Sequence, residues 1–136
     1  MTRLALLIVA ALALVGCGTA PTSAPTIDRA ALPLEVSVAE ADDLREAGAL
    51  MLDVREPSEW ATGHIEGATL ISLGELEARL DELRSDRDIV VVCRSGNRSA
   101  QGRDILLAAG FPSVTSMAGG MIDWIAAGLP VTTAGT

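Results

Sequence analysis

The chain has 136 residues, and its 18 acidic against 10 basic residues give a net charge of −8 at neutral pH. This length allows one domain of ordinary size. The acidic balance, without a basic cluster, argues against nucleic acid as a partner and against direct binding to anionic lipid headgroups.

The first sixteen residues predict an export signal. Arg3 precedes an apolar run over residues 4–15, which is too short to cross a bilayer and is typical of a secretory signal. The sequence Leu14-Val15-Gly16-Cys17 resembles the lipobox of bacterial lipoproteins, and this resemblance implies that Cys17 becomes the lipidated first residue. The alternatives are an ordinary signal peptide with a chance cysteine, or a disulfide between Cys17 and Cys93.

The composition divides the chain into four parts. Residues 1–16 form the predicted signal peptide, and residues 17–33 form the lipidated cysteine with a flexible tether rich in Thr, Ala, Pro and Ser. Residues 34–131 form the folded domain and residues 132–136 a C-terminal tail. We therefore expect a lipid-anchored protein on the extracytoplasmic side of the cell envelope, at the periplasmic face if there are two membranes. Gly18 after the anchor resembles lipoproteins sent to an outer membrane.

Strands alternate with helices along the predicted domain. Ser37 and Glu40 form a capping box that starts a helix ending near Ala47. Apolar runs and glycine punctuation then predict further elements. The expected strands cover residues 34–38, 49–54, 68–71, 89–92 and a segment starting at 114, and the expected helices cover residues 57–60, 73–83, 99–109 and 121–127. This alternation predicts an α/β fold with a parallel sheet covered on both faces.

The central stretch joins a buried strand to a helix through a polar loop that opens on Cys93. Residues 89–92 are a continuous β-branched run, and Ser99 is expected to N-cap the helix that follows. A loop wrapped onto a helix N-terminus directs backbone N–H groups inward and stabilises anions. We therefore expect Cys93 to be a reactive thiolate flanked by Arg94 and Arg98. The alternative is an inert, buried cysteine that ends a strand.

Other polar residues are expected to support this loop. Asp53 and Arg55 predict a structural ion pair or a brace for the active loop, and Glu59 is either a charge at a helix N-terminus or part of that brace. His64 has no second histidine or clustered cysteines nearby, so we expect a structural hydrogen bond rather than a metal site.

Three segments, in the same order, resemble the signatures of a single-domain rhodanese. They are Asp53-Val54-Arg55-Glu56-Pro57 with Gly63-His64-Ile65-Glu66-Gly67-Ala68, then Cys93-Arg94-Ser95-Gly96-Asn97-Arg98-Ser99, then Gly119-Gly120 with Trp124. The resemblance implies a three-layer α/β/α domain around a central, mainly parallel five-stranded sheet. It also implies a sulfurtransferase. The sequence shows no metal-ligand cluster and no nucleotide-binding glycine pattern, so we expect neither a metal nor a cofactor.

The resemblance further implies that Cys93 takes sulfur from a small anionic donor such as thiosulfate and passes it, as a persulfide, to cyanide or a thiol. The substrate and the persulfide would lie in the loop formed by Arg94, Ser95, Gly96, Asn97, Arg98 and Ser99. Because no resolving cysteine is expected, sulfur must leave to an external acceptor, which includes a redox or sulfur-accepting protein partner. The protein is expected to be a monomer.

Two other functions remain open at this point. The first is a phosphatase or arsenate reductase of the wider superfamily, whose loop resembles Cys-x5-Arg. In this chain Cys93 and Arg98 are spaced as Cys-x4-Arg, and this shorter spacing favours sulfur chemistry. A tethered sulfur-carrier or docking module for one protein partner would use the same cysteine as a carrier site.

Overall fold

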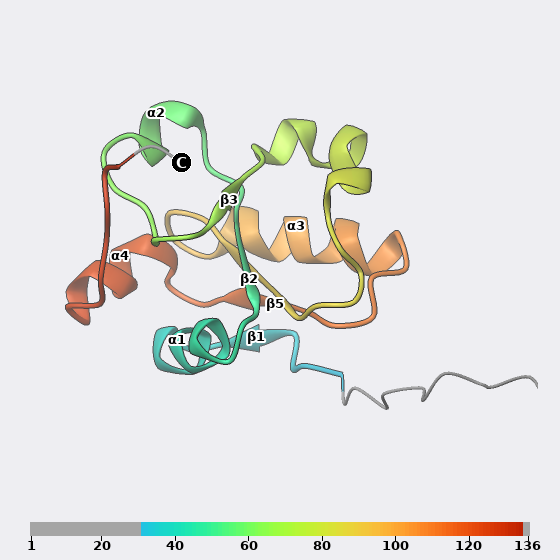
Figure 1. Ribbon diagram of the computed structural model, residues 1–136, viewed down its shortest axis with the longest axis horizontal. Coiled ribbons are helices and arrows are strands. Elements are labelled where there is room, and N and C mark those ends of the chain that lie inside the picture. The colour runs from blue at the N-terminus through green and yellow to red at the C-terminus, as the bar shows by residue number, and fades with distance from the viewer. Residues whose placement is uncertain (1–30, 135–136) are drawn as a thin grey trace, which may run out of the picture.

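Strands alternate with helices in the part of the chain that the computed structural model describes, residues 31–134. The strands are β1 (Glu35–Val36), β2 (Leu50–Asp53), β3 (Thr69–Leu70), β4 (Ile89–Val92) and β5 (Val114–Met117). The helices are α1 (Val38–Glu46), α2 (Pro57–Trp60), α3 (Asn97–Ala108) and α4 (Gly120–Ala126), and η1 (Leu73–Glu82) is a 3-10 helix. The predicted α/β fold class is confirmed (Figure 1).

The five strands form one parallel sheet in the order β1-β5-β4-β2-β3. β4 lies at the centre, and its residues are at most 1% exposed. In the register of β2 and β4, Asp53 pairs with Val92. The residue that follows β4 therefore emerges beside the carboxyl end of β2, so Cys93 and the segment after Asp53 meet at one edge of the sheet.

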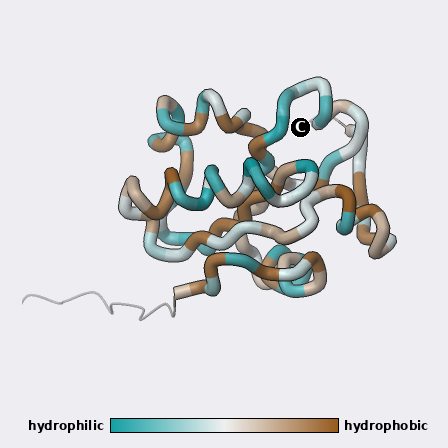
Figure 2. The backbone as a smooth tube through the Cα atoms, turned by 180° about the vertical axis from the view of Figure 1, so that it is seen from behind, coloured by the Kyte–Doolittle hydropathy of each residue, from teal (hydrophilic) through white to brown (hydrophobic). Residues whose placement is uncertain are grey.

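Two apolar cores cover the two faces of this sheet. Along β4 the side chains alternate: Val90 and Val92 belong to the core under α1 and α4, whereas Ile89 and Val91 belong to the core under α3 and η1. A strand buried on both faces must be apolar at every position, which explains the uninterrupted run in the sequence. The hydrophobic strand segments accordingly lie between the helical layers (Figure 2).

The helix after Cys93 begins earlier than predicted. Ser99 was expected to be the N-cap, but α3 starts at Asn97 and Gly96 is its N-cap. Gly96 has a left-handed φ of 103°, which turns the chain into the helix without a side-chain cap. Ser99 instead lies inside the first turn, where its hydroxyl donates to the carbonyl of Gly96 at 2.8 Å.

Residues 73–82 form a 3-10 helix interrupted at Arg79, rather than the continuous helix that was predicted over residues 73–83. Leu73, Leu76 and Leu80 still face the core under α3. The spacing of three between the first two leucines suits a helix of three residues per turn. The capping prediction for α1 is confirmed: Ser37 and Glu40 form a capping box.

The predicted signal peptide, Cys17 and most of the tether lie outside the described residues. At the other end, Thr132 pairs with His64 through two backbone hydrogen bonds, so ordered contacts continue into the predicted tail. Within residues 31–134 no helix is long and apolar enough to cross a membrane.

Candidate active site

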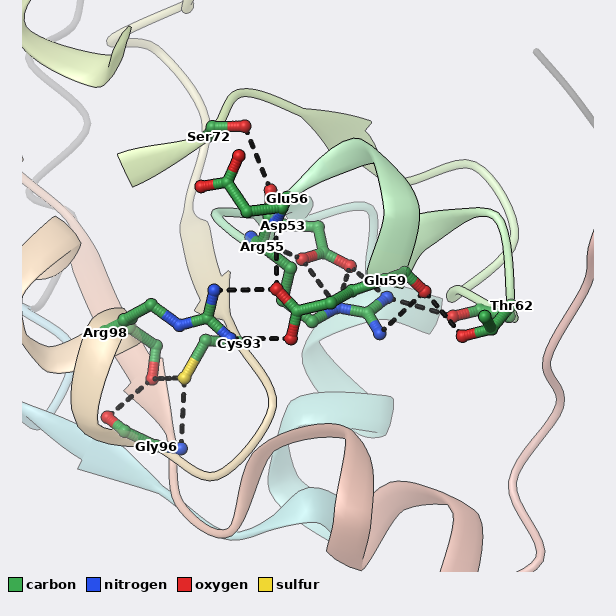
Figure 3. Close-up of polar contacts among 11 residues, drawn as sticks. Asp53, Arg55, Glu56, Glu59, Thr62, Ser72, Cys93, Gly96 and Arg98 are labelled. Atoms are coloured by element: carbon green, nitrogen blue, oxygen red, sulfur yellow. Dashed lines mark hydrogen bonds and ion pairs between the residues drawn. The ribbon is translucent and has the colours of Figure 1, made fainter. Parts of the chain in front are cut away.

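Cys93 lies in a cradle formed by the turn between β4 and α3, which we define as residues 93–99. The thiol is free and fully buried. The backbone N–H of Gly96 donates to its Sγ at 3.1 Å, and the Ser99 hydroxyl lies 3.5 Å from the same sulfur. Figure 3 shows the Cys93 sulfur facing Gly96 at the start of α3. One backbone N–H therefore donates to the sulfur, and the Ser99 hydroxyl, whose own proton goes to the Gly96 carbonyl, accepts from the thiol.

The cradle lowers the pKa of the Cys93 thiol. Burial raises this pKa, but hydrogen bonds from the side chain of Ser99 and from the backbone N–H groups of Ser99, Ser95 and Gly96 lower it more. The net pKa lies below the ordinary value of a cysteine. Because the thiolate is the nucleophilic form of cysteine, the site favours attack by sulfur.

Arg98 is held by a carboxylate from another element. Its Nη1 and Nη2 donate to the two carboxylate oxygens of Glu59 at 2.8 and 2.7 Å, which links α3 to α2 (Figure 3). These hydrogen bonds lower the pKa of Glu59 to about 2, and the Glu59 carboxylate raises the pKa of Arg98. Arg98 lies close enough to Cys93 for the two charges to attract one another. Its own charge is nevertheless largely balanced by Glu59.

A second ion pair, between Asp53 and Arg55, holds α2 and its Glu59 in position. The Arg55 Nη2 donates to Asp53 at 2.7 Å, and both side chains are at most 6% exposed. Arg55 also donates to the carbonyls of Glu59 and Gly63, while the Ser72 hydroxyl donates to the Arg55 carbonyl. Asp53 and Arg55 therefore fix α2, and with it Glu59, to the carboxyl end of β2.

The remaining predicted loop residues lie at the surface. Arg94, Ser95 and Asn97 are at least partly exposed, and within residues 31–134 Arg94 forms no ion pair. The structure thus separates the two arginines that look equivalent in the sequence: Arg98 is paired and half-buried, and Arg94 is unpaired and exposed.

His64 has a packing role in the geometry. Its ring stacks on the ring of Trp60 with centroids 3.6 Å apart, and its Nδ1 lies 3.1 Å from the carbonyl of Trp60. Among residues 31–134 no group of three or more His, Cys, Asp or Glu side chains is placed to hold a metal ion.

Helix α4 is seated directly on the cradle. The N–H groups of Met121 and Ile122 donate to the carbonyls of Cys93 and Arg94 at 2.8 and 3.1 Å. Gly120 makes this approach possible, because a Cβ there would lie 2.4 Å from the carbonyl oxygen of Cys93. In the sequence, the Gly119-Gly120 pair stands out only through the family resemblance. The close backbone contact of Gly120 with Cys93 gives the physical reason for a glycine at this position.

A pocket of about 380 Å3 opens beside the cradle, between α2 and α4. It was not anticipated from the sequence, since its walls come from three separate segments. Its lining consists of Arg55, Ser58, Glu59, Thr62, Arg94, Met121, Ile122 and Ile125. We call this space the α2–α4 pocket.

Comparisons with known proteins agree with this site. The model of the rhodanese-like domain family matches residues 37–127. A sulfurtransferase of Allochromatium vinosum is 39% identical over 82 residues, covering 60% of this chain and 77% of its own. A chloroplastic thiosulfate sulfurtransferase of Arabidopsis thaliana is 36% identical over 111 residues, covering 73% and 92%.

Among solved structures, a rhodanese-related protein from Thermoplasma volcanium is similar, with a TM-score of 0.70 and 31% identity. The similarity covers 75% of this chain and 100% of that one. The chain spans 40% of the length of one other curated relative and 60% of the length of another, so those two proteins carry further segments.

Proposed function

The chain belongs to the rhodanese-like family, and from that membership we propose that it transfers sulfane sulfur from an anionic donor such as thiosulfate to cyanide or a thiol through a Cys93 persulfide. The observation that carries this proposal is the thiol of Cys93, buried in a cradle of donors that lowers its pKa. Sulfurtransferase relatives at 36% and 39% identity support the reaction class.

Two displacements complete the cycle. The Cys93 thiolate attacks the outer sulfur of thiosulfate, a new S–S bond forms, and the old S–S bond breaks with its electron pair leaving on sulfite. An acceptor nucleophile then attacks the outer sulfur of the persulfide, which returns the electron pair to Cys93 as thiolate. A covalent intermediate divides one exchange into two easier steps.

The cradle serves both steps because each begins and ends with negative charge on sulfur. The N–H of Gly96 and the hydroxyl of Ser99 lie at the anionic atom before the donor arrives. Groups already oriented toward developing charge need no reorganisation during reaction. Ser95 contributes through its backbone N–H in the same turn.

The two arginines are proposed to have different roles. Arg94 forms no ion pair with any residue that the structure describes and lines the pocket beside the cradle, where it would attract an anionic donor to an otherwise acidic protein. Arg98 is a positioning residue, since Glu59 already accepts hydrogen bonds from its guanidinium. That pairing also argues against an oxyanion-processing enzyme, in which this arginine would have to hold the substrate.

The direct test is the intact mass of the purified protein after incubation with thiosulfate, and again after addition of cyanide. A gain of about 32 Da on Cys93, lost on adding cyanide, supports the covalent cycle. Cys93→Ser, which preserves size, is the matched control and should show no gain. Absence of the gain in the wild-type protein contradicts the proposal, and loading that cyanide cannot discharge favours a carrier for one protein partner.

We also propose that the protein is held at the extracytoplasmic face of a membrane by lipid on Cys17. The support is the lipobox-like sequence Leu14-Val15-Gly16-Cys17 after an apolar signal. Labelling of expressing cells with an alkyne fatty acid should mark the wild-type chain and not Cys17→Ser. A wild-type chain that incorporates no label would contradict the anchor and leave the sulfur chemistry untouched.

A further inference from the structure

The α2–α4 pocket has one apolar wall that catalysis with an inorganic donor does not use. Ile122 and Ile125 lie three residues apart on α4 and are 49% and 57% exposed. Only two other large hydrophobic residues are comparably exposed within residues 31–134. Two neighbouring isoleucines at the mouth of a site expose apolar surface that a ligand could cover.

This wall has a fixed position relative to the nucleophile. The first N–H groups of α4 donate to the carbonyls of Cys93 and Arg94, so α4 moves with the cradle. A group bound against Ile122 and Ile125 would therefore be held at a constant distance from the reacting sulfur. Such a wall can orient a substrate as well as attract it.

The charges in the pocket favour one kind of ligand. The carboxylate of Glu59 is occupied by both terminal nitrogens of Arg98. The guanidinium of Arg94, in the part of the chain that the structure describes, is left as an unpaired cation. The pocket therefore combines an apolar wall with a site for an anionic group.

We propose that the α2–α4 pocket binds the body of an organic thiol acceptor, an aliphatic chain of several carbons that ends in a carboxylate. The chain would lie on Ile122 and Ile125 and the carboxylate would meet Arg94. A volume of about 380 Å3 falls in the range of small-molecule sites. This inference rests on the proposed sulfur transfer and names its acceptor class.

The chemical step is the second displacement of the proposed cycle. The acceptor thiolate attacks the outer sulfur of the Cys93 persulfide and forms a new S–S bond. The bond between the two sulfurs of the enzyme persulfide breaks, and its electron pair returns to Cys93. The product is an organic persulfide, and no external oxidant or reductant is needed.

The test measures how fast preloaded Cys93 persulfide is discharged by a series of acceptors, with rates corrected for the thiolate fraction of each. The series is 3-mercaptopropionate, 6-mercaptohexanoate, 6-mercaptohexanol and cyanide. The three additional methylenes of the hexanoate, covered on one side only by the apolar wall, should increase the second-order rate about tenfold over the propionate. The carboxylate should add about threefold over the matching alcohol.

Variants assign these preferences to named residues. Ile122→Ser combined with Ile125→Ser should reduce the hexanoate-to-propionate ratio to near one, because the apolar wall is lost. Arg94→Gln should remove the preference of the hexanoate over the hexanol. Leu34→Ser is the matched control, since Leu34 is 60% exposed and does not line the pocket, and it should leave both ratios unchanged.

The outcomes separate this inference from the proposed function. If cyanide discharges the persulfide but chain length and carboxylate have no effect, the acceptor class is wrong and sulfur transfer stands. Uniformly slow discharge by all small thiols also overturns the inference and favours a protein thiol as acceptor. If Cys93 takes up no sulfur from any donor, both proposals fail together.

Discussion

The cradle and the α2–α4 pocket are neighbours built in opposite ways. Cradle groups come from the single segment 93–99, are mostly backbone, and surround a fully buried sulfur. Pocket groups come from α2, α4 and Arg94, are side chains, and leave Ile122 and Ile125 exposed. The difference indicates that one segment sets the reactivity of the sulfur, whereas tertiary packing sets what can reach it.

Two arginine–carboxylate pairs connect these regions, and they differ mainly in burial. The Asp53–Arg55 pair is almost fully buried, whereas the Glu59–Arg98 pair is about 30% exposed. Water and salt screen the second pair more than the first. The expected effects of breaking them differ accordingly.

The largest expected effect is that of Asp53→Ala, which removes the buried ion pair that holds α2 against the sheet. Arg55 would remain buried without its carboxylate, and breaking a buried pair on one side costs about 3–5 kcal/mol. Urea unfolding should show this loss of unfolding free energy. Glu75→Ala, which breaks an exposed pair with Arg79, is the matched control and should cost about 0.5 kcal/mol or less. Equal losses of unfolding free energy in the two variants would contradict a special structural role of the buried Asp53–Arg55 pair.

Gly120→Ala is expected to push α4 away from the cradle. Gly120 has a φ of 58°, and a Cβ there would lie within 2.6 Å of the backbone of Cys93 and Arg94. Strain and overpacking together should cost about 3 kcal/mol. The displaced cradle should also slow alkylation of Cys93, measured with iodoacetamide on protein that is still folded.

Gly128→Ala provides the control for backbone strain alone. Gly128 has a φ of 72°, and no neighbouring atom lies within 4 Å of the position that a Cβ would take there, so only the left-handed conformation is penalised. The expected cost is about 1 kcal/mol, with unchanged alkylation of Cys93. If both glycine variants behaved alike, the close contact of α4 with the cradle would not matter.

Ser99→Ala addresses the cradle without the pocket. The Ser99 hydroxyl lowers the pKa of Cys93, so its removal should raise this pKa and reduce the thiolate fraction at neutral pH. The pH profile of iodoacetamide alkylation measures this change. Ser95→Ala keeps the backbone N–H that acts on the sulfur and should leave the profile in place. A profile that is unchanged in Ser99→Ala contradicts the assigned hydrogen bond.

The sequence predicts the fold and the cradle better than the pocket. The apolar run of β4 and the polar loop after it are local patterns, and they correctly place Cys93 between strand and helix. The predicted start of α3 is wrong, because Gly96 with its positive φ serves as the N-cap where Ser99 was expected. Local patterns cannot distinguish these two caps when both residues are present.

The ion-pair partners of the two arginines near Cys93 could not be predicted from the sequence. Arg94 and Arg98 are equivalent in a linear reading, and only the folding of α2 over α3 brings Glu59 to Arg98. The apolar wall of the pocket was also invisible, since Ile122 and Ile125 fit the pattern of any helix that packs on a core. Contacts between residues that are far apart in sequence decide both features.

The smallest effect is expected at the contact between the two regions, the Glu59–Arg98 pair. Arg98 holds the pKa of Glu59 at about 2, below its ordinary 4.5. Because the folded-state value is the lower one, the stabilisation is present above pH 4.5 and is lost as pH falls toward 2. For this partly exposed pair the expected contribution is about 1 kcal/mol or less.

Glu59→Gln should therefore lower the unfolding free energy by a constant amount at neutral pH, and the difference from wild type should shrink between pH 4.5 and 2. Urea titrations at several pH values measure it. Arg98→Gln should remove the same pH-dependent component, and the double variant should show no further change in that component. Independent, additive losses would mean that α2 and α3 are not joined by this pair, and that the pocket and the cradle are held together by α4 alone.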